Sequence, residues 1–201
     1  MALPQAKQDA TEARIAALDL PKGGWADAAR QSALGRLREM GLPGRRDEYW
    51  KYTRPDTLTQ VEAPRAALFE TGEAPTFSEV DRLNIVFVDG VFDAKASDDL
   101  ALEGVKIERL AEAGSDLHWA QSLYGTLEAN GQKPVQRPLA ALNTAFATDG
   151  LLIHVTGKPS KPIGIRYEHK SETSDAILHH VVKVDNGAEV TILEAGPAAA
   201  R

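Results

Sequence analysis

The sequence predicts an α+β chain in which a helical N-terminal region precedes a strand-rich C-terminal region. Two helical patterns lie before residue 45, the second with a recognisable end, and a hairpin signal follows at 83–94. From residue 151 onward the spacing of apolar residues changes from the period of a helix to that of a strand. We therefore divide the chain into a mainly helical region with a short β-hairpin, 1–150, and a strand core that starts at 151 and runs to 201.

The first two helices are predicted over 5–18 and over the residues that lead up to Gly41. The first is polar with a thin apolar stripe, and in the second apolar side chains recur at near-helical spacing. Glycine favours the left-handed cap and proline cannot continue a helix, so Gly41 and Pro43 predict the end of the second helix. The apolar positions are Trp25, Ala29, Ala33, Leu37 and Met40.

The middle of the chain predicts a connection, a hairpin and a short strand. Residues 54–82 have no clear period and are expected to be extended. The stretch LNIVFVDGVFDA, 83–94, contains a strand, the turn signal Asp89-Gly90 and the beginning of a return strand. A second short strand is predicted at 105–110.

Two more helices are predicted before the strand core. The first covers 115–131, with Ser115 as its cap, Gly131 as its end, and one apolar face formed by Leu117, Ala120, Tyr124 and Leu127. The second covers 138–150, because Pro138 suits a first helical turn.

Four strands then follow without an intervening helix, at 151–155, 163–169, 176–184 and 189–195. Such a run predicts a sheet, a barrel or the coils of a solenoid. The last strand is apolar and nothing follows that would cover it, although an uncovered apolar edge favours aggregation. We expect either a small closed domain or the front part of a longer chain, and self-association by edge pairing stays open.

The composition excludes several classes of protein. The net charge of −6 gives no general attraction to nucleic acid or anionic lipid. There is no cysteine, which excludes disulfides, thiolate metal sites and a cysteine nucleophile. The N-terminus lacks the apolar core of a signal peptide, and no apolar run reaches membrane-spanning length. We expect a soluble cytoplasmic protein with no nucleic-acid or membrane partner.

Known catalytic motifs are absent from the sequence. There is no GxGxxG, GxxxxGK[ST], HExxH or GxSxG, and GKPSKP at 157–162 lacks the second glycine and the helix of a phosphate loop. A metal site on neighbouring strands is conceivable. Its ligands would be the imidazoles of His154, His169 and one of the adjacent residues His179 and His180. Neighbours on a strand point to opposite faces, so that pair cannot share one metal without a bend. We favour histidines that form hydrogen bonds or face water.

Residues 45–52 are the most unusual stretch, because they combine two arginines, a lysine, two acids, a tryptophan and two tyrosines. Aromatics interleaved with cations can stack bases, but the two acids within the cluster argue against a phosphate track. We favour a structural role, in which Trp50 and Tyr52 anchor the connection after the helix and Arg45 and Arg46 pair with acids. A contact with a partner protein is the second interpretation. The candidate residues are Arg46, Glu48, Trp50, Lys51 and Tyr52.

The same stretch, GLPGRRDEYWKYT at 41–53, resembles the Gly-Leu-Pro…Arg-x-Glu-x-Trp-Lys-Tyr-Thr segment of the SufB/SufD family of SUF iron–sulfur cluster assembly proteins. Residues 84–93 resemble the family's hairpin, and 142–158 resemble its Leu-Asn-x-x-Phe-x-x-Asp-Gly segment. The later strands resemble the first turns of its β-helix, so that the resemblance covers roughly 40–200. A helical region that ends in Trp-Lys-Tyr-Thr is more similar to SufD than to SufB.

The resemblance implies a right-handed parallel β-helix whose first turns are 151–201, in a truncated, N-terminal half of the family's chain. It also implies a non-enzymatic scaffold that works with a SufB-like paralogue and a SufC-like ATPase, with iron or an iron–sulfur cluster associated with the full complex. Family members are about twice as long, and the C-terminal region on which the ATPase docks has no counterpart in this sequence. No catalytic, cofactor-binding or metal-binding residue is therefore carried over.

Overall fold

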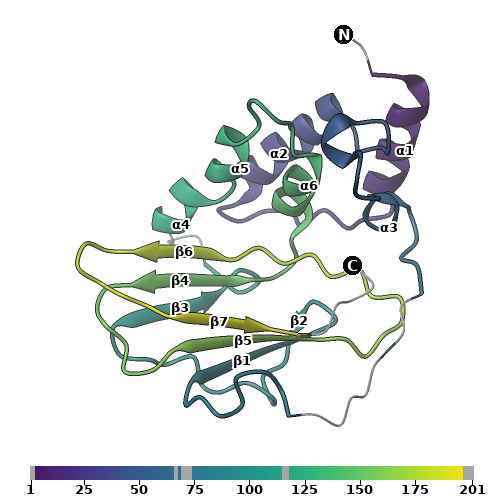
Figure 1. Ribbon diagram of the computed structural model, residues 1–201. Helices are drawn as coiled ribbons and strands as arrows, with labels where there is room; N and C mark the ends of the chain where they lie inside the picture. The colour runs from purple at the N-terminus through teal and green to yellow at the C-terminus, as the bar shows by residue number, and fades with distance from the viewer. Residues whose placement is uncertain (1–2, 66–67, 69–73, 115–117, 197–201) are drawn as a thin grey trace. The chain divides into compact units, whose positions relative to one another are not determined.

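The computed structural model describes residues 3–65, 68, 74–114 and 118–196 (Figure 1). The chain forms two compact units, each built from two stretches of sequence. The helical unit comprises Met1–Pro64 and Gly114–Ala147, and the strand unit comprises Arg65–Ala113 and Thr148–Arg201. The predicted α+β class is confirmed. This grouping follows contacts, whereas the division at residue 150 followed the change of secondary structure along the chain.

The helical unit is organised around α2 and α6, which pack along each other, while α1 contacts α2 and α3. α2 ends at Gly41, as the sequence predicted, although the glycine has φ 64° and ψ 158° rather than the left-handed helical conformation, and Pro138 opens α6. The short α3 lies within 54–82, where only an extended connection was expected. The helices are α1 Gln5–Ala16, α2 Asp27–Met40, the 3₁₀ turn η1 Glu48–Trp50, α3 Asp56–Thr59, α4 His118–Leu123, α5 Thr126–Asn130 and α6 Pro138–Phe146.

The single helix predicted over 115–131 is wrong, because the chain breaks it into α4 and α5 at Gly125. That glycine has φ 72°, and a Cβ there would lie 2.8 Å from the side chain of Thr144. Tyr124 is buried and its hydroxyl donates to the Thr144 carbonyl over 2.8 Å, which turns the chain toward α6. Leu127, expected on the buried face, is therefore 87% exposed. The predicted cap Ser115 lies outside the described residues.

The strand unit consists of two sheets. One has the order β2-β1-β5-β7 and the other β3-β4-β6 (Figure 1). The hairpin β1–β2 and the strand β3 were predicted, and Asp89 and Gly90 form the turn with positive φ angles. The strands are β1 Leu83–Val88, β2 Val91–Phe92, β3 Val105–Arg109, β4 Leu151–Val155, β5 Ile163–Glu168, β6 Val181–Val184 and β7 Ile192–Ala195.

From β4 to β7 the chain alternates between the two sheets. β4 pairs in parallel with β6, and β5 pairs in parallel with β7. Leu152 pairs with Val181 and Ile163 pairs with Ile192, so that each partner lies 29 residues further along the chain. The predicted strands at 176–184 and 189–195 are shorter in the structure than expected. A continuation into a regular right-handed β-helix stays a prediction.

The core of the strand unit lies between its two sheets. Its buried side chains come from both, and alternate residues of β4, which are Leu151, Ile153 and Val155, belong to it. Burying each such aliphatic side chain contributes about 1.5–3 kcal/mol. The core comprises Leu83, Ile85, Phe87, Ile107, Leu151, Ile153, Val155, Ile163 and Ile165.

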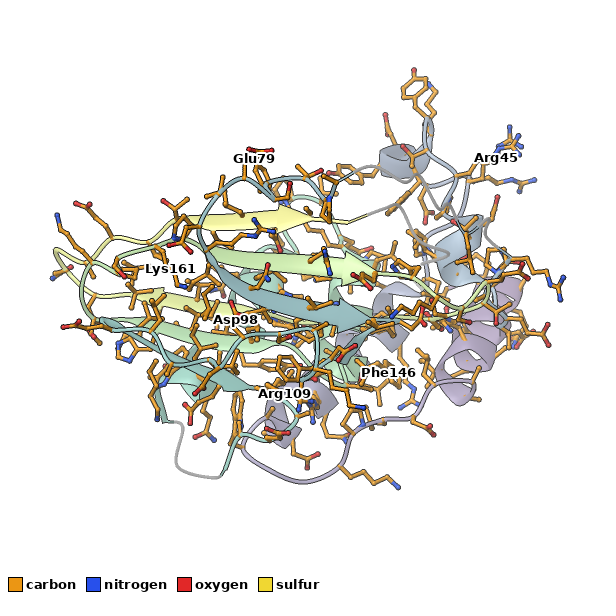
Figure 2. The ribbon with its side chains drawn as sticks, turned by 90° about the horizontal axis from the view of Figure 1, so that it is seen from below. Arg45, Glu79, Asp98, Arg109, Phe146 and Lys161 are labelled. Carbon is orange, nitrogen blue, oxygen red and sulfur yellow. The ribbon has the colours of Figure 1, made fainter. Side chains whose placement is uncertain are left out.

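The strand unit begins its second stretch with a buried ion pair at Asp149. The carboxylate of Asp149 accepts bonds of 2.6 and 3.2 Å from Arg109 on β3 and one of 2.8 Å from the N–H of Gly150. The guanidinium of Arg109 lies 4.7 Å from the ring centre of Phe92 and is labelled in Figure 2. Arg109 thus connects Asp149, at the start of β4, with Phe92 of the other sheet.

Candidate functional site

The candidate site is the segment 41–55, called here the motif segment, together with the surface it adjoins in the helical unit. Its beginning is fixed by burial of Leu42 and Pro43, and by a 2.9 Å bond from the Leu42 N–H to the Thr11 hydroxyl of α1. Its end is fixed by the buried Pro55. The segment is thus held at both ends, while most of what lies between is exposed.

Asp47 fixes the middle of the motif segment. Its carboxylate accepts a 2.9 Å bond from the N–H of Gly44 and forms a 3.0 Å ion pair with Lys7 of α1. Burial alone would raise the pKa of Asp47, but the Gly44 N–H and the Lys7 ammonium outweigh it and lower the pKa. The Asp47 carbonyl then accepts the Trp50 N–H over 2.9 Å, which closes the 3₁₀ turn η1.

The side chains of this turn point outward to a degree that the sequence did not predict. Tyr49 is 66% exposed and Tyr52 is 91% exposed, so the prediction that Tyr52 is an anchor is wrong. Trp50 is half-buried, with its ring edge-on to Tyr49 at 6.3 Å between centroids. Only Trp50 retains part of the anchoring role proposed for the pair.

The cations of the motif segment also differ from expectation. Four cations are exposed, and none of them has a carboxylate of a described residue within 4.0 Å. They are Arg45, Arg46, Lys51 and Arg54. The pairing predicted for Arg45 and Arg46 is therefore wrong, because Asp47 is taken by Lys7 from a helix 40 residues away in sequence. The side chain of Arg45 projects away from the ribbon of its unit (Figure 2).

A groove of about 970 Å³ runs beside η1 in the same unit. The motif segment contributes Glu48, Tyr49 and Trp50, and the end of α2 contributes Glu39 and Met40. Residues 132–136 and Pro138 line it as well. The groove thus combines apolar surface with several charged side chains.

The 132–138 side of the groove is held in place by a chain of polar contacts. Arg36 of α2 forms a two-point ion pair with Glu128 of α5, with a 3.0 Å bond from its Nε. Glu128 also accepts from the Gln132 amide over 2.6 Å, and the amide oxygen of Gln132 accepts the Arg137 N–H over 2.7 Å. The groove is therefore preformed by side chains from α2 and α5.

The structure brings only some of the predicted site residues together at the groove. Glu48 and Trp50 line the groove, whereas Arg46, Lys51 and Tyr52 lie on the exposed surface next to it. The far side of the groove and the role of Lys7 were missed. No local pattern in the sequence connects 132–138 with the motif segment, because the contacts that build the groove are long-range.

We expect Trp50→Ala to lower the free energy of unfolding by about 1–2 kcal/mol, less than the 3–5 kcal/mol typical of a fully buried tryptophan, because the ring is only half-buried. Tyr52→Ala, the matched control, should change it by less than about 0.5 kcal/mol. Urea unfolding followed by far-UV circular dichroism measures both. Equal losses in the two variants would contradict this interpretation of the segment.

The histidines proposed as metal ligands are held by separate partners in the strand unit. His154 lies 3.0 Å from Asp185, and His169 lies 3.1 Å from the Ser174 hydroxyl. Within the described part of the chain, no three histidine, aspartate or glutamate side chains gather where they could hold a metal ion. The described histidines therefore do not form the shared site that the strand pattern left open.

His180 bridges the two sheets through a hydrogen-bond chain. Its Nδ1 accepts the Leu151 N–H over 2.9 Å, and its Nε2 lies 2.9 Å from the Tyr167 hydroxyl. That hydroxyl donates to Glu194 over 2.6 Å, so the proton on the imidazole must sit on Nε2. Burial lowers the pKa of His180, although Glu194 and Asp149 oppose the shift, and the ring is neutral in this network.

Because the folded protein holds His180 with a lowered pKa, the unfolded chain binds more protons as the pH falls through about 6.5. The free energy of unfolding should therefore decrease when the pH is lowered from about 7.5 to about 5.5. In His180→Gln this part of the pH dependence should vanish. Urea titrations at both pH values provide the test. If the free energy of unfolding changed with pH as much in the variant as in the parent protein, the assignment would be refuted.

Fold and site together define a two-unit α+β protein, in which a helical unit with an exposed motif segment is joined to a two-sheet strand unit. The family described as SufBD protein N-terminal region matches residues 16–163. The chain therefore belongs to the SufB/SufD family of SUF iron–sulfur cluster assembly proteins. No curated protein matches it. Among the helices of the described residues, none combines the length and apolar character needed to cross a bilayer.

Proposed function

We propose that this chain is a SufD-type scaffold subunit of iron–sulfur cluster assembly, without enzymatic activity of its own, and that it acts with a SufB-like paralogue and a SufC-like ATPase in the cytoplasm. The observation that carries the proposal is the family match over 16–163, which includes the whole motif segment. The choice of SufD over SufB is supported by the position of Trp-Lys-Tyr-Thr at 50–53, directly after the helices of the N-terminal region.

The strand unit supports the same proposal. Strands that alternate between two sheets with a constant 29-residue offset are what successive coils of a β-helix would give. Each coil buries its apolar face against the next one. We therefore propose that β4 to β7 are the first coils of the family's right-handed parallel β-helix.

Iron or an iron–sulfur cluster is the cargo of the assembly machinery in this proposal. Clusters are held mainly by cysteine thiolates, and this sequence contains no cysteine. We therefore assign the cluster to the full complex and not to a residue of this chain. The contribution of the chain is then to pair with the paralogue.

The test is affinity purification of the tagged protein from its own cells, with mass spectrometry of the intact chain and of its partners. Recovery of a SufB-like paralogue and a SufC-like ATPase is expected. Recovery of a SufD-like paralogue instead would assign the chain to the SufB side of the family. Recovery of neither would overturn the scaffold proposal.

The second candidate function is a stand-alone interaction module without a role in cluster assembly. It is favoured by one observation, the exposed and ordered motif segment beside a preformed groove. The same purification separates the two functions. A stable partner outside the assembly machinery, lost on mutation of the motif segment, would support the module.

A further inference from the structure

We propose that the exposed face of the motif segment and the adjoining groove form a docking site for a short acidic segment of a partner protein that carries an apolar anchor residue. This inference goes beyond the scaffold role and does not depend on it. It rests on three properties of the same surface: rigid placement, an excess of positive charge on the motif segment, and aromatic rings beside a groove that is partly apolar.

The surface is ordered although it is exposed. Its centre is tied down by the Asp47 contacts to Gly44 and Lys7, and its turn is closed by backbone bonds. A partner would consequently bind without first having to order this segment, which removes part of the entropic cost of association. Loose exposed loops lack this property.

The charge of the surface is matched to an acidic partner. Asp47 is neutralised by Lys7, which leaves Glu48 as the one other acid of the motif segment against four exposed cations. This local excess of positive charge occurs on a chain whose net charge is −6. The cations are Arg45, Arg46, Lys51 and Arg54.

The aromatic rings give the surface its second recognition element. Tyr49 and Trp50 line the groove together with Pro134, Val135 and Pro138, so an aliphatic side chain of the partner can enter there. Tyrosine, tryptophan and arginine are the residues that most often dominate binding at protein interfaces. The charges that line the groove balance, three acidic against three basic residues. The excess of positive charge therefore lies on the exposed cations of the motif segment, where the carboxylates of a ligand would bind.

Nucleic acid is the competing ligand for a surface of cations and aromatics. The three carboxylates that line the groove are balanced by three cations, so the groove offers no continuous positive track for a phosphate backbone, whereas a peptide can place an uncharged residue there. An acidic peptide is therefore favoured over a nucleic acid by this arrangement. The experiment includes single-stranded DNA as an outcome.

The experiment is a selection from a random library of displayed peptides against the purified chain, followed by fluorescence anisotropy with the enriched peptide and with single-stranded oligo-dT. The enriched peptides should be acidic with at least one aliphatic residue or proline. Arg45→Glu/Arg46→Glu should weaken the best peptide by about tenfold or more. The indole N–H signal of Trp50, assigned with Trp50→Phe, should shift on binding in ¹H–¹⁵N spectra.

The control is Lys95→Glu/Lys106→Glu, which changes the net charge equally at exposed positions of the strand unit and should alter affinity less than about twofold. Equal weakening in both double variants would overturn the proposal. So would enriched peptides without acidic residues, tighter binding of oligo-dT, a Trp50 signal that does not move, or a selection that enriches nothing. Melting curves confirm that each variant is folded, and none of these results depends on the cluster-assembly partners.

Discussion

Gly150→Ala is expected to lower the free energy of unfolding by about 3–5 kcal/mol, because the added Cβ would lie 2.0 Å from the carbonyl oxygen of His179. That oxygen belongs to the backbone just before the neighbouring strand β6, so it cannot rotate away as a side chain could. The backbone around Gly150 is also fixed, since its carbonyl accepts the Leu110 N–H over 2.9 Å. The backbones that lead into β4 and β6 would have to move apart beside the ion pair of Asp149 and Arg109.

Urea unfolding followed by far-UV circular dichroism measures this loss. All three tryptophans lie in the helical unit, so their fluorescence reports separately on that unit. Gly35→Ala is the matched control, because it makes the same change at an exposed helical position with nothing within 4 Å. Alanine is the better helix former, and the control should gain up to about 1 kcal/mol. A loss below about 1 kcal/mol in Gly150→Ala would contradict the close approach of the Gly150 and His179 backbones.

Asp149→Ala is the second large expected effect, a loss of about 3–5 kcal/mol. The Asp149 side chain is only 5% exposed, and its removal would leave the largely buried guanidinium of Arg109 without its main partner. The variant would also leave the Gly150 and Ala111 N–H groups, which donate to this carboxylate over 2.8 and 3.3 Å, without an acceptor. A buried charge that loses its partner costs more than the pair contributed.

The control for this variant is Glu112→Ala, which removes the other carboxylate that contacts Arg109. The Glu112 side chain is 69% exposed, and an ion pair in water contributes less than about 1 kcal/mol. Each variant removes one carboxylate from Arg109. The difference between the two losses of unfolding free energy therefore reports the effect of burial rather than that of charge alone. If Glu112→Ala cost as much as Asp149→Ala, the pair at Asp149 would not have the structural role assigned to it.

The sequence by itself determined most of the local structure. Turn chemistry and apolar period act over a few residues. They predict the end of α2 at Gly41, the start of α6 at Pro138, the hairpin turn at Asp89-Gly90 and the strand β4. The unusual composition of 45–52 also pointed to the segment that forms the candidate site. These features were predictable because their causes are neighbours in the chain.

The tertiary structure alone decided how the long-range partners meet. Lys7 pairs with Asp47 across 40 residues, and that contact leaves the arginines of the motif segment exposed. Likewise, the packing of Gly125 against Thr144 divides a stretch that has the apolar period of one helix. Local patterns state which face of an element is apolar, but not which distant residue will satisfy a charge or come close to a glycine, because these depend on how the elements pack.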